Sequence, residues 1–205
     1  MAQAGLATEL SGRWQRLVSR WGARAEKVDA EYAELVARYA EPHRRYHTLE
    51  HIAEALVEVD TAHGSPEVEL AVWFHDAIYD TAADDNEHRS AQYADAVLSR
   101  LGAPLRVIAE VKRLVELTAT HVVPPADVNA RVLIDADLAI LRANPARYDR
   151  YVDDVRHEYA HVDDDAWTQG RAAVVRSLLA VTTDAAARSN LTRELTRLSS
   201  SPPQP

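Results

Sequence analysis

Apolar residues recur at spacings of three and four along almost the whole chain, and this periodicity is the strongest constraint on its fold. Such spacing places apolar side chains on one face of an α-helix, whereas a half-buried strand needs strict alternation of apolar and polar residues. The segment 24–39 is typical, with Val28, Tyr32, Leu35 and Val36 in register. No convincing alternating run is present. We therefore expect an all-α protein built as a helical bundle.

Capping residues and prolines divide the periodic sequence into separate helices. Ser65, Pro66 and Glu67 are a clear start signal, because an N-cap is followed by a proline at the first helical position and then by an acid. The expected helices cover about 6–21, 24–39, 48–62, 66–80, 86–101, 104–121 and 127–142, and further helices begin near Asn144, Asp163 and Thr183.

Length and composition are those of a single helical domain. The chain has 205 residues, of which 47% are hydrophobic, and this suffices for one well-buried core. We expect one domain over 1–198, with N-terminal helices at 1–40, a core at 41–145 and C-terminal helices at 146–198. The segment 199–205, SSSPPQP, is expected to be a disordered tail.

Charge and composition also limit the classes of partner. The net charge of −9 is opposite to that of most proteins that grip a nucleic-acid backbone, so we expect no nucleic-acid polymer as partner. We expect no membrane span, because no apolar run approaches about 20 residues. The N-terminus lacks the pattern of a signal peptide, and with 0 Cys the chain suits the cytoplasm. A metal site would have to be built from His, Asp and Glu.

Histidines and aspartates stand at positions where three apolar segments predict core residues. They are His47 and His51 in YHTLEHI, His75 and Asp76 in WFHDAIYD, and Asp135 and Asp137 in LIDADLAIL. Isolated charges inside apolar helices are unfavourable unless they are paired or bind a metal. Taken singly, each of these residues could be a hydrogen-bonded core histidine, a cap or a salt-bridge partner. Their combination on three helices favours a metal site.

The order H…HD…D resembles the HD superfamily of helical, metal-dependent phosphohydrolases. The wider pattern, EPHRRYHTLEHI, WFHDAIYD, DNEHRSA, DADLAIL, RHEYAHV and GRAAVV, is similar to a branch of predicted HD-type phosphohydrolases whose chains are of similar length, and it covers residues 40–195. The resemblance implies that His51, His75, Asp76 and Asp137 bind a divalent metal ion. It also implies an HD-domain-like helical bundle.

Two of these assignments have an alternative. YHTLEHI is also similar to a stretch of cyclic nucleotide phosphodiesterases in which the second histidine binds metal and the first contributes acid catalysis. This implies His51 as the ligand and His47 as a proton donor, with the reverse assignment left open. The last ligand could be Asp135, but the family pattern favours Asp137. Asp135 could then orient a ligand.

The resemblance extends to further candidate residues. Asp80 follows Asp76 at a spacing at which related guanosine tetraphosphate hydrolases carry a catalytic acid, with a solvent-facing acid at a helix C-terminus as the alternative. Arg45, Arg156 and Arg171 are candidates for binding phosphate, with solvated surface arginine as the plain alternative for each. His121 could cap a helix, or bind a second metal or the phosphate.

A site of two imidazoles and two carboxylates suits Mn²⁺, Fe²⁺, Co²⁺, Ni²⁺, Zn²⁺ or Mg²⁺. One ion is favoured over two, because His88 and His121 are the only histidines between the HD pair and the last aspartate. The expected function is hydrolysis of a phosphoester or phosphoanhydride in a small metabolite, with a nucleotide as the first candidate. The alternatives are an HD-type di-iron oxygenase and a non-catalytic helical interaction module. A homo-oligomer stays open.

Overall fold

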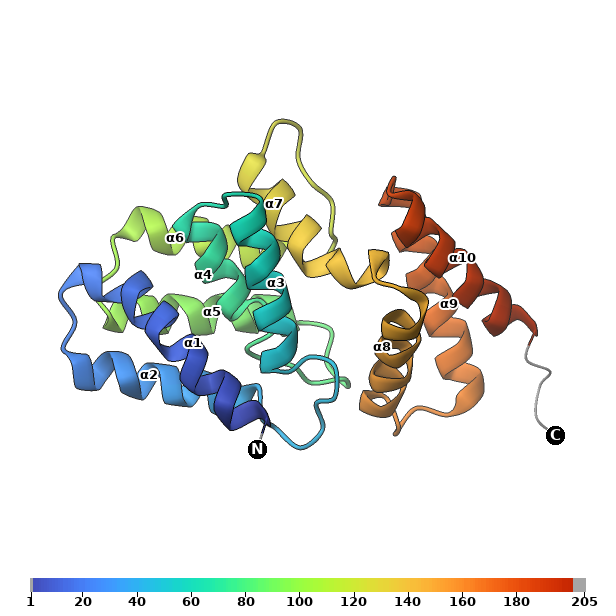
Figure 1. The fold of residues 1–205 in the computed structure, drawn as a ribbon, viewed down its shortest axis with the longest axis horizontal. Coiled ribbons are helices and arrows are strands. Elements are labelled where there is room, and N and C mark those ends of the chain that lie inside the picture. Colours follow the sequence, from blue (N-terminus) through green and yellow to red (C-terminus); the bar gives the residue numbers. More distant parts are fainter. Residues whose placement is uncertain (1, 201–205) are drawn as a thin grey trace. The chain divides into compact units, whose positions relative to one another are not determined.

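The computed structural model describes residues 2–200, and this part of the chain is all-helical, as predicted. The chain forms two compact units, unit 1 (Met1–Asp137) and unit 2 (Leu138–Pro205) (Figure 1). In chain order, the elements of unit 1 are α1 (Ala2–Val18), η1 (Ser19–Trp21), α2 (Ala25–Arg38), α3 (Leu49–Thr61), α4 (Pro66–Phe74), α5 (Asn86–Arg100), α6 (Leu105–Leu117) and α7 (Val128–Asp137). Those of unit 2 are η2 (Leu138–Arg142), α8 (Pro145–Glu158), α9 (Asp164–Val181) and α10 (Ala185–Ser200).

The centre of unit 1 is the short helix α4. Its first turn is fixed by Ser65, whose hydroxyl accepts a hydrogen bond from the backbone N–H of Val68, and by Pro66 at the first helical position. Every residue from Leu70 to Phe74 is buried. A helix that is apolar on all sides must be surrounded by other elements. The sequence of α4 therefore dictates its place inside the unit.

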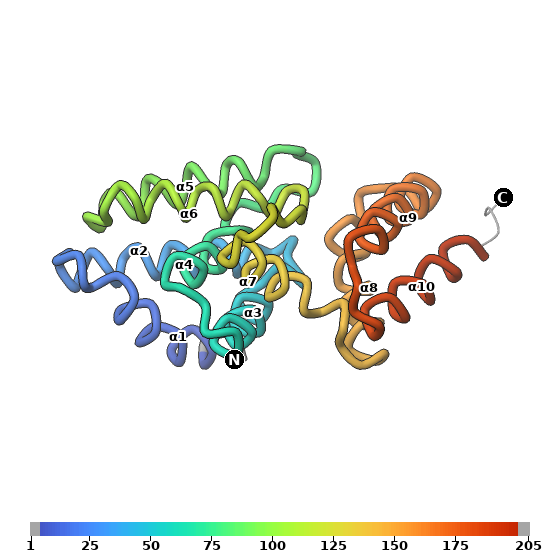
Figure 2. The backbone as a smooth tube through the Cα atoms, turned by 90° about the horizontal axis from the view of Figure 1, so that it is seen from above, coloured from blue at the N-terminus to red at the C-terminus, as the bar shows by residue number. Residues whose placement is uncertain are grey.

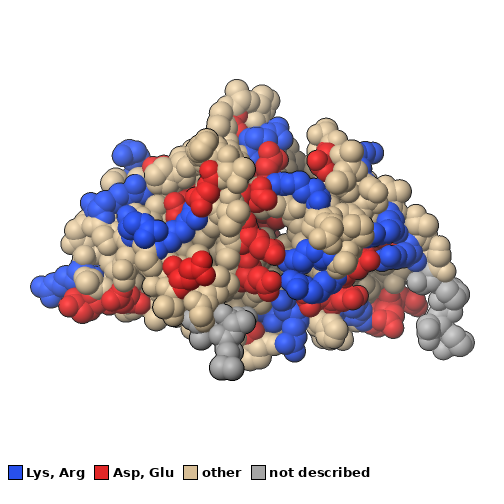
Figure 3. Space-filling view, in the orientation of Figure 1, with Lys and Arg blue, Asp and Glu red and all other residues tan. Residues whose placement is uncertain are grey.

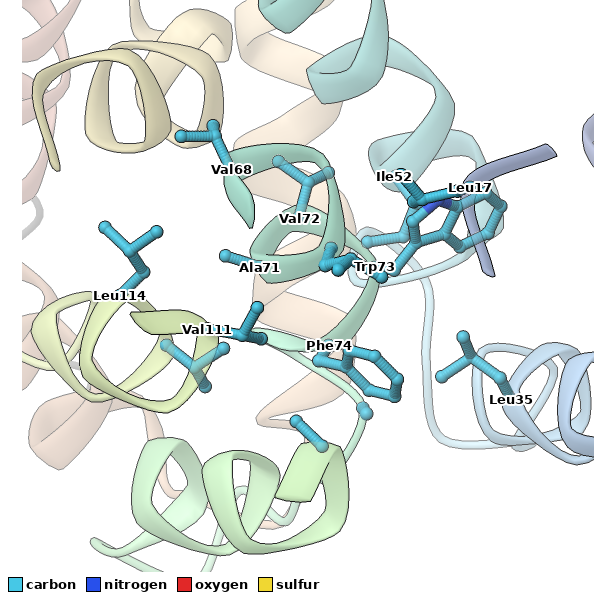
Figure 4. Close-up of a cluster of buried hydrophobic side chains, with 14 of the residues drawn as sticks. Leu17, Leu35, Ile52, Val68, Ala71, Val72, Trp73, Phe74, Val111 and Leu114 are labelled. Carbon is cyan, nitrogen blue, oxygen red and sulfur yellow. The ribbon is translucent and has the colours of Figure 1, made fainter. Parts of the chain in front are cut away.

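Helices from both sides cover α4. In Figure 4, Val111 and Leu114 of α6 lie on one side of α4, and Leu17 of α1 and Ile52 of α3 lie on another; all four are buried. Helices α5 and α6 run alongside each other as an outer layer (Figure 2). The buried residues of α6 follow a helical spacing, namely Val107, Ile108, Val111, Leu114 and Val115. Packing on all sides holds the C-terminal end of α4, where His75 follows, in a fixed place.

Unit 2 has a smaller core that includes buried polar groups. The guanidinium of Arg171 on α9 donates to the carboxylate of Glu194 on α10, with Nε and Oε1 2.7 Å apart. The hydroxyl of Tyr148 on α8 donates to the same carboxylate. The side-chain amide of Asn190 donates to the backbone carbonyl of Leu141, which fastens η2 to α10. The side chains of Arg171, Tyr148 and Asn190 thus each have a buried hydrogen-bond partner.

Three helix ends differ from the sequence-based expectation. Helix α4 ends at Phe74, so His75 is its C-cap and Asp76 lies in the following turn rather than inside a helix. Helix α6 ends at Leu117, four residues before His121, because residues 118–121 form turns. The expected helix over 127–142 is α-helical to Asp137 and changes there to the 3₁₀ helix η2.

Two residues of the segment that the sequence predicts to be disordered are helical. Ser199 and Ser200 belong to α10, and the rest of that segment lies outside the described residues.

Charged side chains of both signs are interspersed over the visible face of the described residues (Figure 3). This distribution accompanies a net charge of −9. Among the described helices, none combines the length and the apolar character needed to cross a membrane.

Candidate metal centre

Three side chains of unit 1, His51, His75 and Asp137, bring potential ligand atoms to one point. The atoms that they offer all lie within 4.8 Å of one another, so the group could hold a metal ion. His51 comes from the first turn of α3, His75 from the C-terminal end of α4 and Asp137 from the last residue of α7. All three are among the four ligands that the sequence predicts.

His51 is placed by the start of α3. The hydroxyl of Thr48 accepts a hydrogen bond from the backbone N–H of Glu50, which sets the first turn of the helix. The side chain of His51 is only 3% exposed, and its ring packs against that of Tyr46 at a centroid distance of 4.9 Å. The imidazole thus has a fixed orientation inside the unit.

His75 has one ring nitrogen engaged with the backbone and the other directed at the cluster. Its Nδ1 lies 2.9 Å from the carbonyl oxygen of Val72. Because a carbonyl oxygen only accepts hydrogen bonds, Nδ1 carries a proton, and in the neutral ring Nε2 is then an unprotonated donor atom for a metal. A backbone or carboxylate acceptor behind the ring is the usual arrangement for a histidine that binds metal.

Asp76 borders the same group. Its Oδ2 lies 3.1 Å from Nε2 of His75 and 3.6 Å from Nε2 of His51. Asp76 is not one of the three residues whose ligand atoms all lie within 4.8 Å of one another. It is therefore close enough to both imidazoles to join them around a shared ion, while its role as fourth ligand remains a prediction.

Asp137 uses its two carboxylate oxygens in two directions. Oδ1 lies 3.4 Å from Nε2 of both His51 and His75. Oδ2 lies 3.1 Å from Nε2 of His121, which must carry a proton to donate to a carboxylate. His121 reaches this place with a φ of 54°, a left-handed conformation that is uncommon for residues other than glycine. The imidazole of His121 thus orients the carboxylate of Asp137.

The spacing of these atoms suits a divalent ion. Ligands at about 2.1 Å from an ion lie about 3.0 Å apart when adjacent in an octahedral shell and about 3.4 Å apart in a tetrahedral one. The nitrogen–nitrogen distance between His51 and His75 is 3.1 Å, and the nitrogen–oxygen distances to Asp137 are 3.4 Å. The same distances are compatible with hydrogen bonds through shared protons, so the group can hold either protons or a metal.

The pKa values of the clustered side chains are consistent with binding of either a proton or a metal. Burial alone lowers the pKa of His75, but the carboxylates of Asp76 and Asp137 outweigh it and raise that pKa well above its usual value. Burial alone raises the pKa of Asp137, yet His75, His121 and His51 bring it well below its usual value. Burial alone also raises the pKa of Asp76, yet His75 and His47 bring it well below its usual value. Two ionised carboxylates attract positive charge, which a proton or a metal can supply.

His47 lies beside the cluster rather than in it. Its ring is 6.1 Å from that of His51 between centroids and packs against the ring of Tyr79 at 4.2 Å. It is half-buried, and its charge acts on the pKa of Asp76. The structure thus groups His51, and not His47, with the other potential ligands. Likewise it groups Asp137 and leaves Asp135 exposed.

Asp80 occupies a different environment from the one its spacing predicts. Because α4 ends at Phe74, Asp80 is not one helical turn beyond Asp76. It is exposed, and its Oδ1 accepts a hydrogen bond from the backbone N–H of Ala82. The side-chain amide of Asn86 accepts a hydrogen bond from the backbone N–H of Asp80 and donates one to its carbonyl. Asp80 therefore shapes the loop before α5.

The predicted phosphate-binding arginines have varied surroundings. Arg45 is exposed and belongs to the loop that carries His47. Arg156 donates to the carbonyls of Tyr159 and Val162 and so braces the turn between α8 and α9. Arg171, which is 6% exposed, is engaged by Glu194. The last two thus have structural partners within unit 2.

The sequence analysis missed Arg44, the residue next to Arg45. Its guanidinium is buried and bonds to backbone carbonyls of the turn that follows α4. The periodicity of the sequence could not distinguish the two neighbouring arginines. No signal in the sequence marks Arg44, because its partners are backbone carbonyls in a turn that the periodicity does not predict.

Comparison with known proteins identified no match among protein-family models, curated proteins or solved structures.

Proposed function

We propose that this chain is a metal-dependent phosphohydrolase of the HD type, acting on a small phosphorylated metabolite, with a nucleotide as the first candidate. The observation that carries the proposal is the meeting of His51, His75 and Asp137 at one point, with Asp76 alongside. These residues come from distant helices in the order H…HD…D. The resemblance noted in the sequence supplies the reaction class, and the geometry supports the ligand set.

Each residue has a defined role in the proposed site. His51, His75 and Asp137 would hold one divalent ion, and Asp76 would complete the set as a second carboxylate. A bound divalent ion lowers the pKa of water and neutralises negative charge on a phosphoryl group. His47, held against Tyr79 beside the cluster, would donate a proton to the leaving oxygen. His121 would keep the carboxylate of Asp137 in place.

The choice of metal follows from the donors. Imidazole nitrogen and carboxylate oxygen together favour Mn²⁺, Fe²⁺, Co²⁺, Ni²⁺ or Zn²⁺ over Ca²⁺. One ion is the simpler proposal, because His88 is exposed and bonds to Gln92 and Glu116 rather than to the cluster.

The first experiment measures metal content and phosphate release on the purified chain. Metals are measured by plasma mass spectrometry, and phosphate release is screened over nucleotides and other phosphorylated metabolites with Mn²⁺, Co²⁺, Ni²⁺ and Mg²⁺. We expect about one divalent ion per chain and metal-dependent release from at least one substrate class. Iron in two equivalents with oxygen consumption would favour the oxygenase instead.

The decisive variant is Asp76→Asn, with Asp135→Asn as the matched control. Both changes remove one carboxylate and keep the side-chain size, but Asp76 borders the cluster and Asp135 is exposed. Because loss of residues that merely orient a ligand costs about 10- to 100-fold, we expect Asp76→Asn to weaken metal binding by more than that. Asp135→Asn should retain wild-type metal content. Full metal content and hydrolysis in folded Asp76→Asn would refute the proposal.

A further inference from the structure

A buried arginine lies directly behind the proposed metal centre. The side chain of Arg44 is 0% exposed, and its guanidinium lies over the rings of Tyr39 and Tyr79 at 5.2 and 5.3 Å from their centroids. Its charge is balanced by Glu41, whose Oε2 lies 3.0 Å from Nε. A guanidinium taken wholly out of water must have its remaining donors satisfied.

Those donors are satisfied by two separate segments of backbone. Nη1 donates to the carbonyl of His47 at 3.0 Å and to the carbonyl of Asp76 at 2.8 Å. Nη2 donates to the carbonyl of Ala77 at 3.3 Å. Because a single nitrogen bonds both carbonyls, the loop of His47 and the turn of Asp76 are tied together at one atom.

These contacts also hold the turn that follows α4. The carbonyls of Asp76 and Ala77 lie beyond the helix, and Arg44 donates to both. The hydroxyl of Ser90 continues this support, because it accepts from the N–H of Ile78 and donates to its carbonyl. Arg44 and Ser90 thus supply hydrogen bonds to backbone groups that no longer belong to a helix.

We infer that Arg44 is a positioning residue that sets the place of Asp76 relative to His47. The inference rests on the proposed metal site for its purpose, although the contacts themselves are independent of a metal. Lysine cannot reproduce them, because one ammonium lacks the planar fork that reaches both segments and Glu41 together. Without the fork, the turn after α4 and the loop before α3 lose their shared anchor.

The test compares Arg44→Lys with Arg13→Lys, both in unit 1. Arg13 is also a forked arginine with carboxylate partners, Asp60 and Glu69, and its side chain is 18% exposed. Both variants should melt at a lower temperature than wild type in circular dichroism. Titration of the metal-free proteins with Co²⁺, followed by visible absorption, should show binding weakened by about 10- to 100-fold in Arg44→Lys and unchanged in Arg13→Lys.

A second readout needs no metal. Long-range ¹H–¹⁵N spectra of the imidazoles should show altered His47 and His75 signals in Arg44→Lys and wild-type signals in Arg13→Lys. If wild type binds no Co²⁺, the proposed function fails, and these spectra alone decide the role of Arg44. Arg44→Gln provides a second variant, because it removes the buried charge and leaves Glu41, whose side chain is 37% exposed, to be solvated.

The inference would be overturned if both Arg44→Lys and Arg44→Gln had a lower melting temperature but kept wild-type imidazole spectra and wild-type Co²⁺ affinity. In that case Arg44 would be a structural cation like Arg13.

Discussion

Two buried clusters, one in each unit, balance their charges in opposite ways. In unit 2, the guanidinium of Arg171 faces the carboxylate of Glu194, so one positive and one negative charge cancel inside the unit. In unit 1, two carboxylates and two imidazoles meet, and neutral imidazoles leave the two negative charges of Asp76 and Asp137 unbalanced. The cluster in unit 1 therefore takes up positive charge from outside, whereas the network in unit 2 is complete by itself.

This difference separates a structural polar core from a binding site. A buried ion pair that is complete costs stability when one partner is removed, because the other charge remains buried. In an incomplete cluster the two carboxylates repel each other until a cation binds. Removing one carboxylate therefore lowers the affinity for the cation more than it lowers the free energy of unfolding. The following predictions test this contrast, from the largest expected effect to the smallest.

The largest effect is expected for Glu194→Gln in unit 2. The change leaves the buried guanidinium of Arg171 without a counter-charge, and we expect a loss of about 3–5 kcal/mol in the free energy of unfolding, measured by urea denaturation. Asp149→Asn is the matched control, because Asp149 pairs with Arg193 and Arg197 at the surface with 37% of its side chain exposed. It should cost less than about 1 kcal/mol. A loss of metal affinity in Glu194→Gln would contradict the assignment of stability to the ion pair in unit 2 and of metal binding to the cluster in unit 1.

Metal should stabilise unit 1 and leave unit 2 unchanged. At a free metal concentration of about 100 times Kd, the gain for a site that forms only on folding is about 2.7 kcal/mol. Tryptophan fluorescence can follow both units, because Trp14 and Trp73 are buried in unit 1 and Trp167 belongs to α9. His75→Gln should abolish the gain. An equal gain in that variant would place the metal elsewhere.

His121→Ala should weaken metal binding by about 10- to 100-fold, equivalent to about 1.4–2.7 kcal/mol. The variant removes the N–H that holds Oδ2 of Asp137. His63→Ala is a suitable control, since His63 also has a positive φ, of 52°, at the end of α3. Isothermal titration calorimetry measures the metal affinity of both variants. Equal affinities would show that Asp137 can bind metal without the hydrogen bond from His121.

The pH dependence should distinguish proton from metal as the occupant of the cluster. The pKa of His75 is raised from its ordinary 6.5. Its contribution to the stability of the metal-free protein is therefore full below about pH 6.5 and is lost as the pH rises through the raised value.

Metal must displace that proton, so affinity should rise by about tenfold, or 1.4 kcal/mol, per pH unit until the raised pKa is reached. Calorimetry in two buffers of different ionisation enthalpy counts the protons released. Affinity that does not change between pH 6 and pH 8 would show that metal displaces no proton from His75 in this range.

The sequence predicted the helices and the cluster because both depend on local pattern. Apolar spacing identified α2, α3 and α6, and Ser65 and Pro66 identified the start of α4. The polar interruptions in WFHDAIYD and LIDADLAIL identified His75 and a choice between Asp135 and Asp137, since a charge in an apolar segment needs a partner. The family resemblance then favoured Asp137. The structure brings His51, His75 and Asp137 together as a group that could hold a metal ion, while metal binding and the reaction stay predictions.

The remaining features depend on contacts between residues that are distant in sequence. The turn after α4 is held by hydrogen bonds from Arg44 and Ser90, which periodicity does not reveal. His121 reaches Asp137 through a left-handed turn, a conformation that its residue type does not predict. The boundary between the units at Asp137 and Leu138 falls inside one continuous apolar run, LIDADLAIL, so no change in composition marks it.

The complete burial of α4 also determines how unit 1 exchanges its backbone hydrogens with solvent. Water can reach the amides from Leu70 to Phe74 only when the surrounding helices separate, so their exchange reports opening of the unit as a whole. The loop at 81–85, which is largely exposed, exchanges through local motion. We therefore expect His75 to be attached to the slowest-exchanging part of the unit. Without a bound metal, this imidazole should keep its position until the unit unfolds as a whole.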